Sequence, residues 1–227
     1  MLNVTGGLTA IIPVRAGSKR LRNKNILPFG ESNLLIHKIN QLKKVDAINE
    51  IVVSSDSDEM LDMAKKEGVL VHKRELIYAD EITKSFSEVI MNVVSHCGTR
   101  EHVMWAPCVC PLCDENDFKN AIESYNKKVL ETKCFDSIIS SKSFKEYLWD
   151  EYKPINYSLG EGHVPSQQLP NFQTIVNGFY LASRENMLTW KYFFGLKPYR
   201  LEISQVHAID IDTEFDYQCA LVAWSLR

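Results

Sequence analysis

Four apolar, β-branched segments, separated by stretches with helical spacing, constrain the fold of this chain most. They are residues 8–14 (LTAIIPV), 51–53 (IVV), 69–71 (VLV) and 102–106 (HVMWA). Continuous apolar runs of this kind are typical of strands that are buried on both faces of a parallel sheet. Because parallel strands need a crossover between them, the order predicts an α/β fold with a doubly wound, mostly parallel sheet and right-handed connections.

The segments between these strands carry apolar residues at helical spacing, as crossover connections require. The first predicted helix carries Leu34, Leu35, Ile39, Leu42 and Val45. Ser57 is expected to cap the second helix, and Gly68 to mark its end. Further helices are expected over residues 86–94 and around residues 118–125.

A second group of elements surrounds a break in this pattern. A strand over residues 137–140 precedes an irregular or β-rich insertion, about residues 144–176, where aromatic residues, prolines and glycines follow no regular period. We then expect a strand over residues 178–182, a helix from Arg184, a strand over residues 199–203, an extended segment over residues 206–211 and a closing helix from Glu214. The 227 residues carry no repeat or linker and are expected to form one domain.

The charge balance argues against several classes of partner. The chain has 26 Lys and Arg against 29 Asp and Glu, a net charge of −3, whereas proteins that bind nucleic acids or anionic membranes usually carry a basic excess. No apolar run approaches the roughly 20 residues of a membrane span, and the start of the chain lacks a signal-peptide pattern. We therefore expect a cytoplasmic protein with neither nucleic acid nor membrane as its partner, and six reduced cysteines.

The densest local signal is a basic loop directly after the first strand. It carries five cations, Arg15, Lys19, Arg20, Arg22 and Lys24. Gly17 and Ser18 in the same loop can present backbone N–H groups to a phosphate while the cations neutralise its charge. The loop therefore predicts a polyphosphate site, although it matches neither the P-loop nor the Rossmann fingerprint. A solvated surface loop is the alternative interpretation.

A pair of carboxylates near the end of the chain is the second signal. Asp210 and Asp212 are two residues apart on a segment that we expect to be extended, so their side chains project to the same side. Paired carboxylates suit Mg²⁺, which commonly binds one or two of them together with substrate phosphates. The alternative is that Asp212 or Thr213 caps the last helix and Glu214 complements its dipole. A polyphosphate loop in the same chain favours the metal interpretation.

Several segments stand in a recognisable order: AIIPVRAGSKRLRNKNI, IVVSSDSDEMLDMAKKEG, KRELIYADEITKS, NGFYLAS and AIDIDTEFDYQCA. This order, from about residue 8 to residue 224, resembles the CMP-sialic acid synthetases, also called acylneuraminate cytidylyltransferases. The resemblance implies a Rossmann-like nucleotidyltransferase fold. It also implies transfer of CMP from CTP to a sugar-type acceptor with release of pyrophosphate, in the synthesis of activated sugars for surface glycans.

The resemblance also assigns roles to residues at matching positions. Phosphate binding falls to Arg15 and Lys24, and contact with the cytosine and ribose falls to Asn25. The implied nucleotide-binding set is Arg15, Ala16, Gly17, Ser18, Lys24, Asn25, Arg74 and Ser85. Asp210 and Asp212 match the Mg²⁺ ligands. Arg15, Lys24 and Asp212 are the expected catalytic residues, because phosphoryl chemistry needs positioning and charge neutralisation more than a nucleophilic side chain. The family also leads us to expect a homodimer.

The acceptor side of the chain departs from the family pattern. A Q-P-T-S-P-L-R segment of the family reads PCVCPLC here, with Pro107, Cys110 and Cys113 in place of the Gln, Ser and Arg. A later R-Q-D-L-P element lacks its Asp and has Ser166 in place of its Arg. Because losing Arg donors weakens recognition of a carboxylate, the alternatives are a sugar phosphate or phosphonate acceptor with a CDP-type product, or a non-catalytic nucleotide-binding protein. A nucleotidyltransferase that uses UTP or GTP is a third alternative.

Three cysteines and a group of aromatic residues are interpreted as packing residues. The C-x-C-x-x-C motif at residues 108–113 could bind zinc or an iron–sulfur cluster, but no fourth ligand stands at a suitable spacing. We therefore favour small side chains that line a pocket at the end of a strand. Tyr147, Trp149 and Tyr152 in the insertion are expected to pack a small sheet or a dimer contact.

Overall fold

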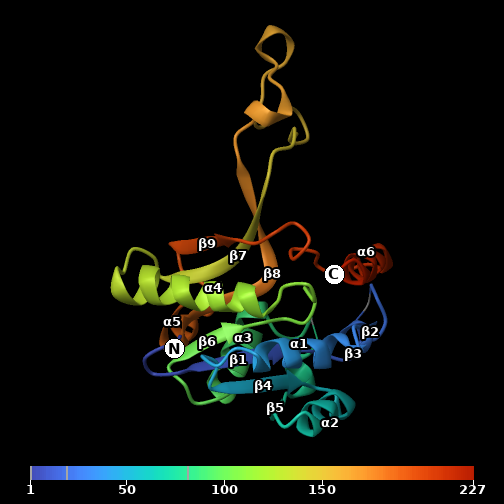
Figure 1. The fold of residues 1–227 in the computed structure, drawn as a ribbon, viewed down its shortest axis with the longest axis vertical. Helices are drawn as coiled ribbons and strands as arrows, with labels where there is room; N and C mark the ends of the chain where they lie inside the picture. The colour runs from blue at the N-terminus through green and yellow to red at the C-terminus, as the bar shows by residue number, and fades with distance from the viewer. Residues whose placement is uncertain (1, 19, 81) are drawn as a thin grey trace.

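A mixed sheet of seven strands forms the centre of the computed structural model, which describes residues 2–18, 20–80 and 82–227 (Figure 1). The strands are β1 (Leu8–Pro13), β4 (Glu50–Ser55), β5 (Leu70–Lys73), β6 (His102–Trp105), β7 (Ser137–Phe144), β8 (Phe172–Ser183) and β9 (Pro198–Glu202). Their order in the sheet is β5-β4-β1-β6-β8-β7-β9, and only β8 runs antiparallel to its neighbours. The predicted α/β fold with a mostly parallel sheet is confirmed.

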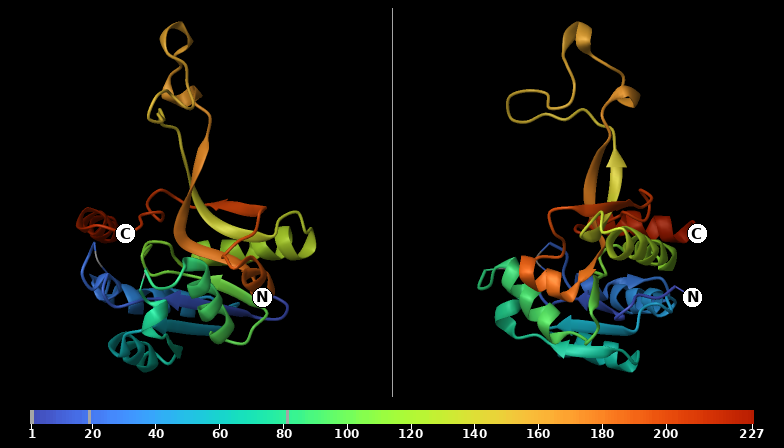
Figure 2. Two further views of the ribbon diagram at one scale, coloured as in Figure 1. Left: turned by 180° about the vertical axis from the view of Figure 1, so that it is seen from behind. Right: turned by 90° about the vertical axis from the view of Figure 1, so that its left-hand side faces the viewer.

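Helices cover both faces of this sheet (Figure 2). They are α1 (Leu34–Lys43), α2 (Asp58–Lys66), α3 (Phe86–His96), α4 (Glu115–Tyr125), α5 (Arg184–Trp190) and α6 (Glu214–Ser225). A short ribbon of β2 (Pro28–Phe29) and β3 (Ser32–Asn33) lies apart from the sheet, beside α6 (Figure 1). In the part of the chain that the structure describes, no helix has the length and apolar character that crossing a membrane requires.

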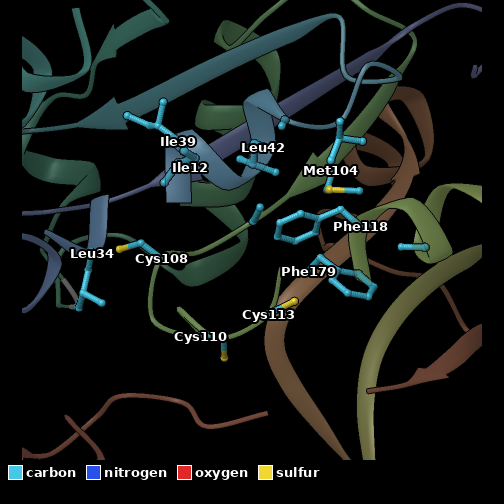
Figure 3. Close-up of a cluster of buried hydrophobic side chains, with 14 of the residues drawn as sticks. Ile12, Leu34, Ile39, Leu42, Met104, Cys108, Cys110, Cys113, Phe118 and Phe179 are labelled. Atoms are coloured by element: carbon cyan, nitrogen blue, oxygen red, sulfur yellow. The ribbon is translucent and has the colours of Figure 1, made fainter. Parts of the chain in front are cut away.

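The alternating side chains of the central strands fill two separate cores. Ile12 of β1 lies in the core that α1, α2 and α4 cover, together with Phe118 and Phe179 (Figure 3). Ile11 points to the opposite face and packs in the core that α3 and α5 cover. Because successive side chains of a strand point to opposite faces, only a strand that is apolar throughout can sit between two helical layers. This explains the continuous apolar runs.

The helix boundaries follow side-chain capping. Ser57 caps α2, and its hydroxyl accepts a hydrogen bond from the backbone N–H of Met60, as the sequence predicts. Gly68 follows the end of α2 with a φ of +72°, a left-handed conformation that suits glycine. Thr213 caps α6 in a reciprocal pair with Asp216. The capping alternative is therefore confirmed for Thr213, and the side chain of Asp212 is left for other contacts.

The insertion forms an arm, residues 145–171, that rises away from the sheet on the extended ends of β7 and β8 (Figure 1). It is irregular as predicted, with a single bridge between Trp149 and Pro154 as the strand pairing among its described residues. Residues 172–176 at its predicted end belong to β8, and residues 172–175 pair with β7. The rings of Tyr147 and His163 stack at 5.1 Å, so the arm has an aromatic cluster of its own.

The prediction of an extended segment over residues 206–211 is wrong for its first half. Residues 205–208 form a turn, in which the N–H of Ala208 donates to the carbonyl of Ser204 and the N–H of His207 donates to the hydroxyl of Ser204. These local bonds replace the ladder that a strand would need. The N–H of Ile211 donates to the carbonyl of Val109, which ties the segment with Asp210 and Asp212 to the loop after β6.

His37 connects α1 to the ribbon, to α6 and to the loop after β6. Its ring lies edge-on to Phe29 at 5.0 Å and to Trp224 at 4.9 Å, and its Nε2 lies 3.1 Å from the carbonyl of Pro111. Burial, together with the charge of Lys38, lowers the pKa of His37 from 6.5 to about 4. The unfolded chain therefore binds a proton more readily than the folded chain between these two pH values.

We expect the free energy of unfolding to be greatest above pH 6.5 and to fall by about 3 kcal/mol through this group as the pH drops to 4. Urea unfolding at several pH values would show this loss in the wild type and a smaller loss in His37→Gln. His163→Gln, on the exposed arm, is the matched control and should retain the wild-type dependence. An identical dependence in His37→Gln would contradict the prediction.

Candidate active site

A cavity of about 780 Å³ opens at the carboxyl ends of β1 and β6, where open α/β sheets usually bind ligands. It collects side chains from distant parts of the sequence. Among the predicted site residues, those that line it are Arg15, Ser18, Lys24, Asn25, Arg74, Asp210 and Asp212. The fold therefore brings the basic loop and the carboxylate pair to one place.

Asn25 holds the basic loop in shape at one wall of the cavity. It is buried, and its Nδ2 donates to the carbonyl of Arg15 at 3.0 Å. Its Oδ1 lies 3.2 Å from the thiol of Cys108 on the loop after β6. The guanidinium of Arg15 donates to the carbonyl of Ala79 at 3.1 Å. These bonds fix the loop at the wall of the cavity.

The five cations of the loop are not equivalent. Arg15, Arg20 and Lys24 line the cavity, whereas Arg22 is exposed and lies outside its lining. Lys19 lies outside the residues that the structure describes. The loop thus combines both interpretations of its composition, because part of its charge faces the cavity and part faces solvent.

Asp212, on the segment before α6, forms ion pairs with two cations of the basic loop. Its Oδ1 lies 2.9 Å from Nη2 of Arg20 and 3.0 Å from Nζ of Lys24. The side chain of Lys24 is only 15% exposed, whereas that of Arg20 is 68% exposed, so Lys24 makes the better shielded pair. Both cations are placed to exchange this carboxylate for an anionic ligand.

Asp210 has one occupied oxygen and one free oxygen. Its Oδ2 accepts a hydrogen bond from Nδ2 of Asn177 at 2.7 Å. Its Oδ1 is buried and has no hydrogen-bond partner among the described residues. Burial raises the pKa of Asp210, the bond from Asn177 opposes this, and the charge of Asp212 adds to it. Because a buried carboxylate oxygen without a partner is unfavourable, and because Mg²⁺ prefers such oxygens, the two aspartates fit a magnesium ion.

Arg74 and Ser85 lie in different surroundings. Arg74 follows β5, is 4% exposed, and donates through Nη2 to the carbonyl of Val14 at 2.5 Å, so its guanidinium forms part of the cavity wall. Ser85 caps α3 in a reciprocal pair with Glu88 and is not part of the described lining. Its neighbour Lys84 does line the cavity.

Ala16 and Gly17 line a second, shallower pocket that shares Arg15 with the cavity. Gly17 has a φ of +72° and open space where a Cβ would stand, so the loop can turn sharply there. The N–H of Ala16 donates to the carboxylate of Asp56 at 2.9 Å. One backbone N–H group of the loop is thus already hydrogen-bonded to a carboxylate of the protein itself.

A family model for cytidylyltransferases matches residues 9–147. The chain belongs to the cytidylyltransferase family. A pseudaminic acid cytidylyltransferase of Campylobacter jejuni is 26% identical over 227 residues, with 96% of each chain covered. An N-acylneuraminate cytidylyltransferase of Escherichia coli is 25% identical, and the match covers 94% of this chain but 51% of that relative. The chain thus spans about half of the one relative and nearly all of the other.

Solved structures support the fold of this family member. A CMP:2-keto-3-deoxy-manno-octonic acid synthetase complexed with CTP superposes with a TM-score of 0.65 at 12% identity, covering 96% of this chain and 99% of that chain. A 4-diphosphocytidyl-2C-methyl-D-erythritol synthase of Anaerococcus prevotii superposes with a TM-score of 0.66 at 15% identity, covering 97% and 99%. Together with the sheet order, these similarities confirm the Rossmann-like nucleotidyltransferase fold.

Sequence reasoning missed the aromatic wall of the cavity and the asparagine beside it. The wall includes Trp105, Tyr180 and Phe193, whose rings pack within 4.9 Å of one another in the pairs Trp105–Phe193 and Tyr180–Phe193. Asn177 of β8 also lines the cavity. A signal was present, because Asn177 is a polar residue directly before the strand predicted over residues 178–182, and Trp105 is the last residue of β6. Nothing in their spacing showed that β8 lies next to β6.

The cysteine motif after β6 lies in the core of this family member. Cys108, Cys110 and Cys113 are each at most 1% exposed, and Figure 3 shows Cys113 beside Phe179 and Cys108 on the side of Leu34. Burial raises the pKa of each thiol, so all three are neutral. This confirms the packing interpretation, although the three thiols pack in the core and do not line the cavity.

The replaced acceptor-side residues are not all in the cavity. Pro107 lines it, whereas Cys110 and Cys113 are buried in the core and Ser166 lies on the arm. The reason is that buried Lys38 of α1 donates to the carbonyls of Cys110 and Cys113, each at 3.1 Å, and draws this part of the loop inward. At Cys110 and Cys113, therefore, the sequence change alters the core.

Proposed function

We propose that this protein is a Mg²⁺-dependent cytidylyltransferase that transfers CMP from CTP to a sugar-type acceptor, releases pyrophosphate, and supplies activated sugars for surface glycans. The observation that supports this proposal most is that the basic loop and the carboxylate pair line the same cavity. Lys24 and Arg20 reach Asp212 across the cavity, although they are far from it in sequence. Cations that face two aspartates form the charge pattern that a triphosphate with a divalent ion requires.

The side chains of the site have separate tasks in this reaction. An oxygen of the acceptor attacks the α-phosphorus of CTP, the new oxygen–phosphorus bond forms, and the bond to pyrophosphate breaks. Arg15, Arg20 and Lys24 would neutralise the phosphates, with help from N–H groups near Gly17. Asn25 and Arg74, which line the same cavity, would contact the nucleoside. No cysteine nucleophile is involved, since the thiol of Cys108 is buried and neutral.

Asp210 and Asp212 are the proposed magnesium ligands. The bound ion would supply charge neutralisation to the phosphates. The free Oδ1 of Asp210 supports this assignment, because it has no other partner among the described residues. Asp212 becomes available when Lys24 and Arg20 turn to the phosphates.

The acceptor is proposed to lie against the aromatic wall. Trp105, Tyr180 and Phe193 contribute apolar atoms to the cavity lining, although each residue is only 4% exposed, and this lining can contact the apolar part of a sugar. Lys84 also lines the cavity and pairs with Glu88 at 2.8 Å, and it would exchange this partner for an acidic group of the acceptor. The relatives also support a nonulosonic or other sugar acid, since they include N-acylneuraminate and pseudaminic acid cytidylyltransferases.

A screen of acceptors tests the proposal. The purified protein would be incubated with CTP, Mg²⁺ and a panel of sialic-type acids, shorter keto-sugar acids, sugar phosphates and sugar phosphonates. We expect pyrophosphate release and a CMP-linked product of matching mass with at least one sugar acid, and no release with UTP or GTP. A CDP-type product would show instead that the acceptor is a sugar phosphate and not a sugar acid. CTP binding in a thermal shift assay without turnover of any acceptor would instead favour a non-catalytic role.

We also propose that residues 1–227 form one domain and that two copies associate through the arm. Trp149, Tyr152, Ile155 and Leu159 on the arm are between 53% and 80% exposed. Large apolar side chains on a protruding segment are typical of an interface with another chain. Sedimentation analysis should show a dimer for the wild type and a larger monomer fraction for a Trp149→Ser, Ile155→Ser double variant.

A further inference from the structure

Three side chains form a line of hydrogen bonds at the cavity wall. The hydroxyl of Tyr180 donates to Oδ1 of Asn177 at 2.6 Å, and Nδ2 of Asn177 donates to Oδ2 of Asp210 at 2.7 Å. Both hydrogen bonds require the same orientation of the Asn177 amide. A flipped amide would place its oxygen against the carboxylate oxygen, where neither atom carries a proton to share.

A bulge in the sheet turns Asn177 toward the cavity. Tyr180 of β8 pairs with Ile139 of β7, but the next pair on β7 is Ser141 with Ile175, so the ladder is interrupted around Asn177. Buried Ser140 stabilises the bulge, because its hydroxyl donates to the carbonyl of Val176 at 2.7 Å and accepts from the N–H of Phe179 at 3.0 Å. Bulges commonly redirect side chains next to active sites.

The ring of Tyr180 is equally well held. It is 4% exposed and stacks on Phe193 with a centroid distance of 4.6 Å. A ring packed in this way cannot swing its hydroxyl away without opening the aromatic wall. Tyr180 therefore fixes the amide of Asn177, and the amide in turn fixes one oxygen of Asp210.

The two aspartates are prepared differently for a cation. Asp212 pairs with Lys24 and Arg20, which neutralise its charge. Asp210 is held by a neutral amide, which orients the carboxylate and leaves its negative charge in place. Its other oxygen, Oδ1, is buried and without a partner among the residues described.

We propose that Asn177 is a positioning residue for metal binding: it holds Oδ2 of Asp210, so that Oδ1 is the atom presented to the ion. The inference rests on the proposed magnesium site. Partners that orient a metal ligand typically change metal affinity by about 10- to 100-fold. Asn177 touches neither the ion nor the phosphates in this role, and Tyr180 acts one step further out.

Binding of Mn²⁺ as a probe for Mg²⁺ tests this role without an acceptor. Electron paramagnetic resonance would measure the affinity of the full chain for Mn²⁺ in the presence of CTP. We expect Asn177→Ala to bind Mn²⁺ about 10- to 100-fold more weakly, and Tyr180→Phe, which keeps the ring packing, about 3- to 10-fold more weakly. Asn116→Ala, at an exposed position of α4, is the matched control and should bind like the wild type.

Several outcomes would overturn the inference. One is an unchanged Mn²⁺ affinity in a folded Asn177→Ala variant. If that variant does not fold, an unchanged affinity in Tyr180→Phe has the same consequence. Failure of the proposed function is a separate result, since wild-type protein could bind Mn²⁺ with CTP and still release no pyrophosphate with any acceptor. A wild type that binds no Mn²⁺ in the presence of CTP would remove the metal site and this inference together.

Discussion

Asp212→Ala is expected to lower the kcat of CMP transfer by at least about 10³-fold while the protein stays folded. Removing the carboxylate takes away one of two proposed ligands of the magnesium ion. Loss of that charge stabilisation costs about 4 kcal/mol in the transition state, and each 1.36 kcal/mol corresponds to a tenfold change in rate. Steady-state measurement of pyrophosphate release with CTP and the best acceptor would give the value.

The fold should tolerate this substitution. The side chain of Asp212 is 38% exposed, so solvent reaches its carboxylate in both ion pairs, with Arg20 and with Lys24. Exposed pairs contribute about 1 kcal/mol or less, which corresponds to a change in Tm of only about 2–4 °C for a chain of this size. The helix that follows keeps its cap, because the capping side chain belongs to Thr213.

The matched control is Asp62→Ala, which removes an exposed aspartate that pairs with Lys65 on α2. Its kcat should equal that of the wild type. A folded Asp212→Ala variant with near-normal kcat would show that Asp212 is not a metal ligand, and the proposed mechanism would then lose its central group.

Lys24→Ala is expected to raise the KM for CTP by about 10- to 100-fold. Lys24 is the most shielded cation that faces Asp212, with a side chain that is 15% exposed. A hydrogen bond to a charged group in such a place is worth about 1.5–3 kcal/mol, and 1.4 kcal/mol corresponds to a tenfold change in affinity. Initial rates over a range of CTP concentrations at saturating Mg²⁺ would measure the effect.

Arg22→Ala provides the control within the same loop. Arg22 carries the same kind of charge but is exposed and lies outside the cavity lining that the structure describes. Its removal should change the KM for CTP by less than about twofold, because an exposed charge is screened by solvent. Equal effects of the two substitutions would mean that the loop acts through its net charge and not through Lys24.

Much of the architecture could be predicted from the sequence, because its signals are local. The continuous apolar run of β1 shows that the strand is buried on both faces. Ser57 and Gly68 lie directly beside the two ends of α2, so each marks its end of the helix locally. The basic loop and the aspartate pair were also visible, since several residues of one charge class stand close together in the chain.

Other features depend on which segments the fold brings together. The family resemblance matched Ser85 to a nucleotide contact, but the hydroxyl of Ser85 pairs with Glu88. Asn177 lines the cavity, although no sequence spacing pointed to it. Asn177 reaches Asp210 because β8 inserts antiparallel between β6 and β7 and bulges opposite Ser140 of β7. A bulge is set by pairing between strands that are far apart in the sequence, so a single strand does not reveal it.

The amino-acid sequence alone was sufficient for the order of strands and helices, the charge of the loop and the presence of two aspartates that suit a metal. The folded chain was needed to show that Lys24 and Arg20 face Asp212. It was also needed to show that, among the residues the structure describes, Arg22 does not line the cavity and Oδ1 of Asp210 has no hydrogen-bond partner. The physical reason is the distance along the chain over which each signal acts. Periodicity, capping and charge density act over a few residues, whereas an ion pair between Lys24 and Asp212 exists only after the crossovers and the final turn have placed both side chains at one edge of the sheet.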